Sequence, residues 1–484
     1  MLMDRVGEEL NMPVKRNPDW FKVVRREIAN VETINIGLVN IDGVRIHEAD
    51  LDLKVNVVKV HFTPIRYNEI PWSELSPERM DESSNCPDIP MPRFVDYENL
   101  DAVVARVPRR ECKHGVMRDV SRLQVNLVVA NLLARSRGKD DRDRPVFAVF
   151  FDSCDPMMEI FRCQDMLWHF GNSWVYKPEL ARIKELLLMP VGPCQFVPPF
   201  SRPGKTIDTA FKLKESTRQR QAYVTILHTS EDYVCGAIVL AQSIIQSNST
   251  KDLILLVDSN ISLRSIDGLR AAGWKIRRIE RIRSPYSRKD AYNEWNYSKL
   301  RIWQLKQYDK IVFIDADLIA NRNLDSMFLY PELTAAGNYQ RHLFNSGLMV
   351  VEPSECTFRT LLRKMKVVES YNGGDQGFLN EMFAWWHRLP ARMNYLKVFV
   401  DPEDDQHWID GDDVFAVHYT GLKPWKCGDE GRDCNWESPV FERYASDSGH
   451  RMWWKVYRRM PEELREFCEL QNGDSSSSTT SASM

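Results

Sequence analysis

The alternation of strand-like and helical patterns in the second half of the chain limits the fold more than any other feature of the sequence. Short apolar runs suited to buried strands lie at residues 223–228, 252–257 and 311–314. Residues 233–245 and 263–272 repeat apolar side chains at spacings of three and four, which predicts a helix after each of the first two strands. This alternation favours an α/β fold, with a mostly parallel sheet covered by helices on both faces. Ligands of such sheets bind beyond the carboxyl ends of the strands.

Two carboxylates, Asp315 and Asp317, follow directly on the strand at residues 311–314. In an extended chain residues i and i+2 point to the same side, so the two carboxylates converge while Ala316 faces away. Neighbouring carboxylates repel each other unless a cation lies between them, and their oxygen atoms suit Mn²⁺ or Mg²⁺. The pattern therefore predicts a metal site at the end of this strand. The alternative interpretation is an Asp-x-Asp sequence that only caps a helix.

A further strand pattern, residues 344–351, begins with small polar residues. Asn345, Ser346 and Gly347 allow backbone and amide groups to approach a hydroxylated ligand closely. This favours a contact with a sugar. An ordinary turn before a strand would use the same residue types, so that interpretation stays open.

The glycine-rich segment at residues 372–383 leads into a predicted helix that begins near Asp375 and Gln376. Paired acceptors and donors of this kind suit adjacent hydroxyl groups of a hexose, and the glycines let the chain come near the sugar. Asp375 is also stabilised as an anion at a helix N-terminus, so a helix cap is the alternative.

The segment HYTGLKPW, residues 418–425, carries a histidine and a lysine of chemical interest. His418 would complete a metal site through its neutral imidazole, and Lys423 would place a positive charge against a phosphate. The alternative for His418 is a buried core residue. Lys423, two residues after Gly421 and just before Pro-Trp, is harder to explain by packing alone.

These four motifs, in this order, resemble the motif series of the glycogenin-like retaining glycosyltransferases. The matching stretches are IDADLIANRNLD, LFNSGLMVVEPS, YNGGDQGFLNEMF and HYTGLKPW. The resemblance covers residues 222–425 and implies a GT-A fold, a Rossmann-like domain that binds a nucleotide sugar. The surrounding sequence, including NEWNYSKLRIWQLKQYDK and the earlier DPMMEIFRCQDMLWHFGNSWVYKPE, resembles the plant UDP-glucuronate:xylan alpha-glucuronosyltransferases. That second likeness extends over most of the chain.

The resemblance implies a role for each matching position. Asp315 and Asp317 match the metal-binding Asp-x-Asp, and His418 matches the metal-binding histidine. Lys423 matches the lysine that meets the diphosphate, and Lys299 matches a lysine near the donor. The segment that holds uracil and ribose matches the stretch around His228, Thr229 and Tyr233. The predicted substrate-binding set is Lys299, Asp315, Ala316, Asp317, Asn345, Ser346, Asn372, Gly373, Gly374, Asp375, Gln376, His418, Gly421 and Lys423.

Two positions depart from the glycogenin pattern. Glycogenin-type proteins have an aspartate at the position of Asn372, and they space histidine and lysine by one more residue than His418 and Lys423. Both departures fit the plant xylan branch. They imply that glycogenin chemistry does not transfer directly to this chain.

The implied reaction is the retaining, Mn²⁺-dependent transfer of glucuronic acid from UDP-glucuronate to the xylan backbone, with Asp375 and Lys423 in catalytic positions. One alternative is a self-glucosylating initiator like glycogenin that uses UDP-glucose, with Tyr330 or Tyr339 as the modified residue. Another is a non-catalytic scaffold of the same fold.

The carboxylate of glucuronate requires a cation near its C6 atom. The basic candidates are Arg301, Arg341, His342 and Arg388.

Tryptophans could stack on the faces of acceptor sugars, although buried packing is the default for each of them. These tryptophans are Trp385, Trp386, Trp425, Trp453 and Trp454.

Composition and charge limit the partners. The chain carries 65 Lys and Arg against 68 Asp and Glu, a net charge of −3, which gives no signature for nucleic acid. No apolar run approaches the ~20 residues that span a bilayer, so no transmembrane segment is predicted in this chain. The resemblance implies the Golgi apparatus, where such enzymes are usually anchored by an N-terminal helix. A homodimer is left open.

The predicted organisation has five parts. Residues 1–34 form an N-terminal helical or irregular segment, 35–200 a smaller accessory α/β domain, 201–221 a linker, 222–470 the GT-A domain and 471–484 a disordered tail.

The ten cysteines form no CxxC pair, which argues against a structural zinc site. Cys427 and Cys434 bracket a polar turn and would close a small disulfide loop in an oxidising compartment. Two unrelated thiols are the alternative.

Overall fold

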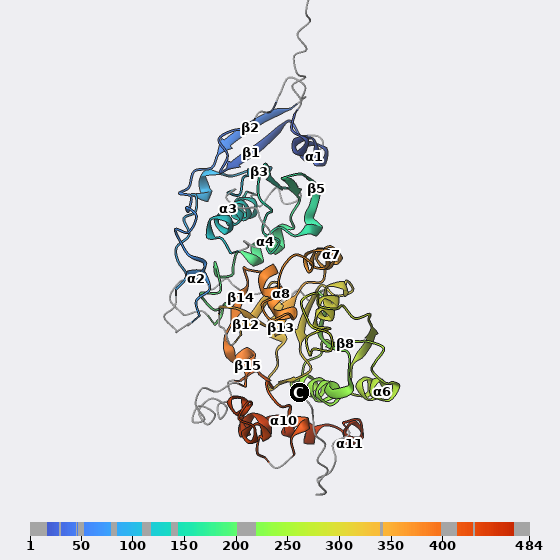
Figure 1. Cartoon of the computed structure of the whole chain (residues 1–484). Helices are drawn as coiled ribbons and strands as arrows, with labels where there is room; N and C mark the ends of the chain where they lie inside the picture. Colours follow the sequence, from blue (N-terminus) through green and yellow to red (C-terminus); the bar gives the residue numbers. More distant parts are fainter. Residues whose placement is uncertain are drawn as a thin grey trace, which may run out of the picture. The chain divides into compact units, whose positions relative to one another are not determined.

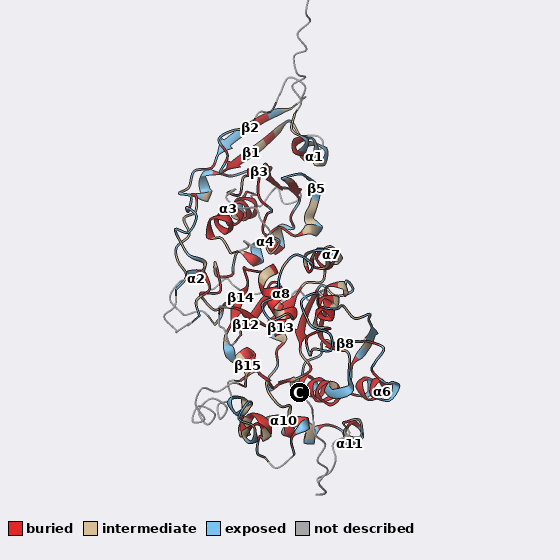
Figure 2. Cartoon of the chain, viewed as in Figure 1, coloured by how far each residue is buried: buried red, intermediate tan, exposed pale blue. Residues whose placement is uncertain are grey.

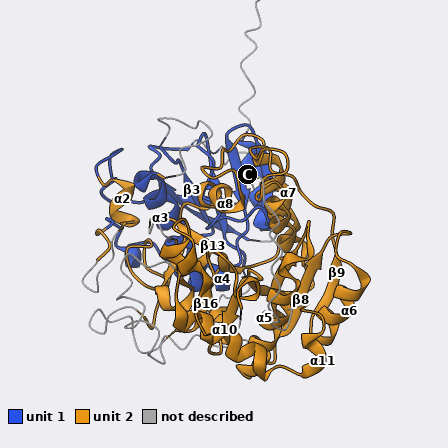
Figure 3. Cartoon of the chain, turned by 60° about the horizontal axis from the view of Figure 1, so that its bottom comes forward, with its two compact units in different colours: residues 1–69, 89–112, 119–187 blue, residues 70–88, 113–118, 188–484 orange. Residues whose placement is uncertain are grey.

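The computed structural model separates into two compact units (Figures 1 and 3). Unit 1 comprises residues 1–69, 89–112 and 119–187, and unit 2 comprises residues 70–88, 113–118 and 188–484. The structure describes residues 17–28, 31–44, 46, 53–78, 85–108, 118–136, 144–200, 219–338, 342–397, 414–428 and 431–468. Most of the predicted linker and all of the predicted tail lie outside these residues.

Unit 1 contains a six-stranded sheet in the order β2-β1-β3-β4-β6-β5. Its strands are β1 (Thr33–Val39), β2 (Lys54–Lys59), β3 (Ala102–Ala105), β4 (Phe147–Phe150), β5 (Met166–Phe170) and β6 (Ser173–Tyr176). The first four strands run parallel to one another. Strand β6 pairs antiparallel with β4, and β5 pairs antiparallel with β6. The helices of this unit are α1 (Asp19–Glu27), α3 (Val120–Arg135) and α4 (Leu180–Leu186). Helix α1 places Trp20 and Phe21 in a core cluster with Ile34 of β1.

Unit 2 contains a seven-stranded sheet in the order β14-β12-β13-β10-β7-β8-β9. Its strands are β7 (Gln221–Leu227), β8 (Asp252–Val257), β9 (Lys275–Arg278), β10 (Lys310–Ile314), β12 (Thr334–Gly337), β13 (Phe344–Val351) and β14 (His387–Leu389). Only β13 runs antiparallel to its neighbours. The predicted α/β architecture with a mostly parallel sheet is therefore confirmed. The carboxyl ends of β7, β8 and β10 share one edge of this sheet.

Helices and a small second sheet complete unit 2. The helices are α2 (Trp72–Leu75), α5 (Val234–Gln246), α6 (Leu263–Ala271), α7 (Glu355–Lys364), α8 (Asp375–Met382), α10 (Asp447–Arg459) and α11 (Glu462–Arg465). The small sheet contains β11 (Leu318–Ala320), β16 (Ala416–His418) and β15 (Tyr395–Leu396), in the order β11-β16-β15. Helix α5 is almost entirely buried, whereas α6 has an exposed face (Figure 2). Because β11 follows β10 after a short turn, the small sheet brings residue 418 to the end of β10.

Disulfide bonds link cysteines that are close and distant in sequence. The pairs include Cys86–Cys194, Cys235–Cys468 and Cys427–Cys434. The predicted small loop closed by Cys427 and Cys434 is thus confirmed. None of the helices in the described ranges has both the length and the apolar character that crossing a membrane requires.

Candidate functional site

The Asp315 and Asp317 carboxylates lie just beyond β10, at the shared carboxyl edge of the sheet. The backbone nitrogen of Asp315 donates to Gly347 O in β13 at 2.8 Å, and Tyr419 N donates to Asp317 O at 2.9 Å. β11 pairs with β16 so that Leu318 is opposite His418. One ligand atom from each of Asp315, Asp317 and His418 lies within 4.8 Å of the other two. The fold therefore brings the three predicted metal ligands together.

The space around these three residues fits a divalent cation. A Cβ atom on Gly347 would lie 2.5 Å from His418 Cε1 and 3.0 Å from Asp315 Oδ2, so only glycine leaves the ring and carboxylate this close to the backbone. His418 Nε2 lies 3.3 Å from Asp317 Oδ1, and its buried Nδ1 has no hydrogen-bond partner among the described residues. Two carboxylates and one imidazole form a ligand set that Mn²⁺ or Mg²⁺ accepts.

Two lysines also neutralise the aspartates, which the sequence argument did not foresee. Lys299 Nζ lies 3.3 Å from Asp315 and 2.8 Å from Asp375 Oδ2, and Lys423 Nζ lies 2.7 Å from Asp317 Oδ2. Three carboxylates face two ammonium groups here, so the cluster retains excess negative charge that can attract a divalent cation.

The pKa values in this cluster follow from burial and from these ion pairs. Burial raises the pKa of the Asp315 carboxyl, with Lys299 opposing the rise and Asp317 adding to it. Burial also acts to raise the pKa of Asp317, but Lys423 and His418 outweigh it and the pKa is lowered. For Lys299 and Lys423, burial acts to lower the pKa, but the facing carboxylates raise it overall. Both lysines are thus cationic at neutral pH.

A hydrogen-bond network joins the predicted sugar-facing residues. Ser346 Oγ donates to Asp375 Oδ2 at 2.8 Å, the same oxygen that Lys299 binds. Gln376 Oε1 accepts from Asn345 Nδ2 and from Ser346 N, each at 3.2 Å. The start of β13 and the start of α8 therefore present amide and carboxylate groups side by side, an arrangement that suits adjacent sugar hydroxyls.

The turn before α8 is ordered by Asn372. Its Oδ1 accepts from Gly374 N at 3.0 Å and from Gly377 N at 3.2 Å, which satisfies backbone donors at the beginning of the helix. Asp375 forms the first residue of α8, after the N-cap Gly374. The helix-cap alternative for Asp375 is therefore replaced by a cap from Asn372, and the Asp375 side chain is left for Lys299 and Ser346.

The loop that carries Lys423 is held by a side chain further along the chain. Gly421 has a φ of +76°, and Leu422 N donates to Asn435 Oδ1 at 2.9 Å. A Cβ on Gly421 would lie 2.5 Å from that same Asn435 oxygen. Lys423 also donates to Tyr419 O at 2.6 Å. This loop therefore returns Lys423 to the carboxylate cluster and does not leave it in solvent.

The segment matched to uracil and ribose binding lies at the carboxyl end of β7. Tyr233 packs edge-to-face on Trp425, with ring centroids 5.6 Å apart, and lies 5.8 Å from Lys423 Nζ. Burial lowers the pKa of His228 to about 4, so its ring is neutral near pH 7. Thr229 N donates to Asp258 Oδ2 at 3.0 Å. The sequence reasoning missed Asp258, although an aspartate directly after the strand at residues 252–257 is the same signal that identified Asp315.

The basic residues considered as partners of the donor carboxylate make their contacts elsewhere. Arg301 donates to Glu280 O, and His342 lies 3.7 Å from Glu78, while Arg388 stacks over Trp386. None of these contacts involves the carboxylate cluster, and Arg341 lies outside the described residues. All five tryptophans proposed as sugar platforms are buried, so packing is their role: Trp385, Trp386, Trp425, Trp453 and Trp454.

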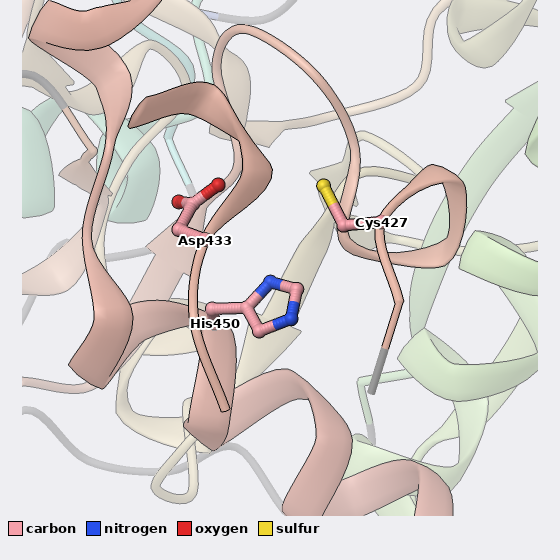
Figure 4. A group of neighbouring side chains, drawn as sticks. All are labelled: Cys427, Asp433 and His450. Carbon is pink, nitrogen blue, oxygen red and sulfur yellow. The ribbon is translucent and has the colours of Figure 1, made fainter. Parts of the chain in front are cut away.

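A second group of potential metal ligands lies near the start of α10. Figure 4 shows Cys427, Asp433 and His450 pointing toward one another, with ligand atoms all within 4.8 Å. Cys427, however, is bonded to Cys434, and the Asp433 carboxylate accepts hydrogen bonds from Lys397, Asn435 and Ser446. These groups are occupied by the fold, so this cluster is structural.

The chain matches two protein-family models in succession. A model described as the GUX1-5 N-terminal domain matches residues 11–194, and one described as glycosyl transferase family 8 matches residues 224–428. A protein of Arabidopsis thaliana described as UDP-glucuronate:xylan alpha-glucuronosyltransferase 2 is 45% identical over 458 residues, which cover 90% of this chain and 76% of that protein. Another, provisionally described as number 5 of the same series, is 48% identical over 95% of this chain and 83% of its own length. Inositol phosphorylceramide glucuronosyltransferase 1 of the same plant is 39% identical over only 43% of each chain.

Proposed function

The chain belongs to the UDP-glucuronate:xylan alpha-glucuronosyltransferase family, and on that basis we propose that it transfers glucuronic acid from UDP-glucuronate to xylan. It is a glycosyltransferase with an N-terminal α/β domain and a GT-A domain. The observation that carries the proposal is the meeting of Asp315, Asp317 and His418 beside Lys423 and Asp375 at one edge of the sheet.

The proposed mechanism uses the charges of this cluster to stabilise the leaving UDP. Lys423, which pairs with Asp317 before ligand binds, would contact the diphosphate and offset the charge that develops as the anomeric C–O bond breaks. A divalent cation held by Asp315, Asp317 and His418 would supply further positive charge at the same oxygens. The Asp317 carboxylate and the diphosphate would therefore compete for Lys423.

The sugar would lie over β13 and α8, where Asn345, Ser346 and Gln376 provide donors and acceptors. Asp375 is pinned by Lys299 and Ser346, so its carboxylate keeps one orientation toward the sugar. The family retains the configuration of the anomeric carbon. Among the carboxylates of the cluster, Asp375 is the one at the start of α8, next to the proposed position of the sugar.

The proposal includes Mn²⁺ as the metal and the Golgi apparatus as the compartment. Two carboxylates and one imidazole are compatible with Mn²⁺. Disulfides such as Cys86–Cys194 and Cys235–Cys468 form in oxidising compartments, which supports a location in the secretory route.

Self-glucosylation is less well supported by the structure. Tyr330 is buried, with 2% of its surface exposed, and its hydroxyl donates to Pro198 O at 2.7 Å. Such a tyrosine cannot act as an acceptor on the surface. Tyr339 lies outside the described residues.

A donor panel tests the proposed function. With Mn²⁺ and a xylo-oligosaccharide acceptor, UDP-glucuronate should give transfer at least about tenfold faster than UDP-glucose or UDP-galactose. A neutral donor leaves unpaired the site cation that the glucuronate carboxylate requires, which costs about 1.4 kcal/mol or more. Product is measured by mass spectrometry of the oligosaccharide. Preference for a neutral donor would overturn the substrate assignment, and hexose added to a tyrosine of the chain itself would favour the initiator.

A further inference from the structure

Three tyrosines are exposed close to the sugar-facing residues. Tyr371 is 50% exposed, Tyr292 is 86% exposed and Tyr286 is 36% exposed. Large aromatic side chains are costly to leave in water, and exposed ones that gather beside a site mark contact surfaces. The five tryptophans first considered for this role are buried, whereas these tyrosines are exposed aromatic groups among the residues that the structure describes.

Tyr371 is joined directly to the sugar-facing network. Its hydroxyl accepts a hydrogen bond from Gln376 Nε2 at 2.9 Å, while Gln376 Oε1 accepts from Asn345 and Ser346. Gln376 thus uses one end of its amide for the sugar-facing residues and the other for an exposed ring. The exposed ring of Tyr371 is therefore joined by one hydrogen bond to the residues proposed to face the donor sugar.

Two hydrogen bonds fasten the segment with the other tyrosines to the Tyr371 turn. Asn293 Nδ2 donates to Asn372 O at 2.8 Å, so Tyr292 and Tyr371 each precede one partner of this pair. Ser284 Oγ donates to Gly373 O at 2.6 Å, and a Cβ on Gly373 would lie 3.2 Å from Tyr286 O. The two segments are therefore one surface, although they are far apart in sequence.

The raised pKa of Tyr371 agrees with this placement. Burial is the largest cause of its raised pKa, and the charges of Asp375 and Tyr292 are among the further causes that act in the same direction. Tyr371 is thus close enough to Asp375 and Tyr292 for their charges to shift its pKa. The phenol stays neutral and can donate or accept hydrogen bonds with a sugar.

We infer that Tyr286, Tyr292 and Tyr371 form the acceptor surface, on which rings of a xylose chain stack next to the donor sugar. This inference rests on the proposed function, since it takes the acceptor to be xylan. Sugar rings have apolar faces that pack on aromatic side chains, and their hydroxyls bind the phenol oxygens.

Kinetics with xylohexaose test the surface. Tyr371→Ala and Tyr292→Ala should each raise the KM for xylohexaose about tenfold, as expected for loss of an aromatic contact of more than 1 kcal/mol. For Tyr292→Ala, the KM for UDP-glucuronate and the slow hydrolysis of UDP-glucuronate without acceptor should stay within about twofold, because it is Tyr371, and not Tyr292, that binds Gln376 of the sugar-facing network. Tyr292→Phe should retain most of the binding. Tyr67→Ala, which removes a 49%-exposed tyrosine of unit 1, serves as the control.

The outcomes separate this inference from the proposed function. If the wild type transfers glucuronate but the alanine variants keep its KM for xylohexaose, the acceptor surface is overturned and the function stands. If the wild type transfers nothing to xylohexaose, the proposed function fails, and direct binding of xylohexaose by calorimetry then decides. Binding that the alanine variants weaken would still support the surface, whereas binding that is absent or unchanged would overturn it.

Discussion

Asp317→Asn is expected to lower the rate of glucuronate transfer by about a thousandfold or more. The substitution removes the negative charge that pairs with Lys423 and His418 and that would face the metal ion. A metal ion supplies several kcal/mol of charge stabilisation in the transition state, and each 1.36 kcal/mol changes the rate about tenfold. Initial rates with UDP-glucuronate, Mn²⁺ and xylo-oligosaccharide measure the effect.

Asp309→Asn is the matched control for this substitution. Asp309 lies directly before the other end of β10, where it pairs with Arg220 at 2.9 Å near the surface. Its loss should leave the transfer rate within about twofold, since surface ion pairs contribute little. Retention of more than a tenth of the wild-type rate in Asp317→Asn would contradict the assigned role of that carboxylate.

Lys299→Met is expected to remove activity and to lower the free energy of unfolding of unit 2 by about 3–5 kcal/mol. Lys299 is buried between Asp315 and Asp375, and its loss would leave two buried carboxylates without their shared partner. The free energy of unfolding is measured by denaturant titration. The added prediction is partial recovery of stability by Mn²⁺, because the cation can replace part of the lost positive charge.

Lys310→Met separates the two effects of the Lys299 substitution. Lys310 is also a buried lysine, at the start of β10, but it binds Tyr330 O at 2.8 Å and lies 3.6 Å from Glu352, away from the carboxylate cluster. This variant should be destabilised to a similar extent, yet its folded fraction should transfer glucuronate at nearly the wild-type rate. Equal loss of specific activity in both variants would show that Lys299 has no particular place in the site.

Local patterns were sufficient to predict most elements of unit 2. The strand predicted at residues 344–351 has the same bounds in the structure as β13, and the helix predicted at residues 263–272 differs from α6 by one residue. Periodicity is reliable there because these segments are strongly apolar on the faces that the core requires. The pairing of β13 antiparallel to β10 was not predicted, because strand direction depends on connections that periodicity does not describe.

The identities of the candidate site residues were predicted from the sequence, but the contacts among them were not. The Asp-x-Asp pair was visible because alternation in a strand places both carboxylates on one side. The ion pairs Lys299–Asp375 and Lys423–Asp317 join distant segments, so no local pattern indicates them. For the five tryptophans, buried packing was the default interpretation, and the structure agrees with it. Which aromatic side chains stay exposed is decided by the packing of the whole fold. Tyr371 and Tyr292 became candidates only once their exposure was known.

The most direct test of the metal site is a crystal structure with Mn²⁺ and UDP, analysed by anomalous scattering at the manganese edge. We expect one strong anomalous peak within about 2.0–2.6 Å of Asp315, Asp317 and His418, with Lys423 turned from Asp317 toward the diphosphate. UDP bound in this edge of the sheet with Lys423 still on Asp317 and no manganese peak between the two aspartates and the histidine would contradict this expectation.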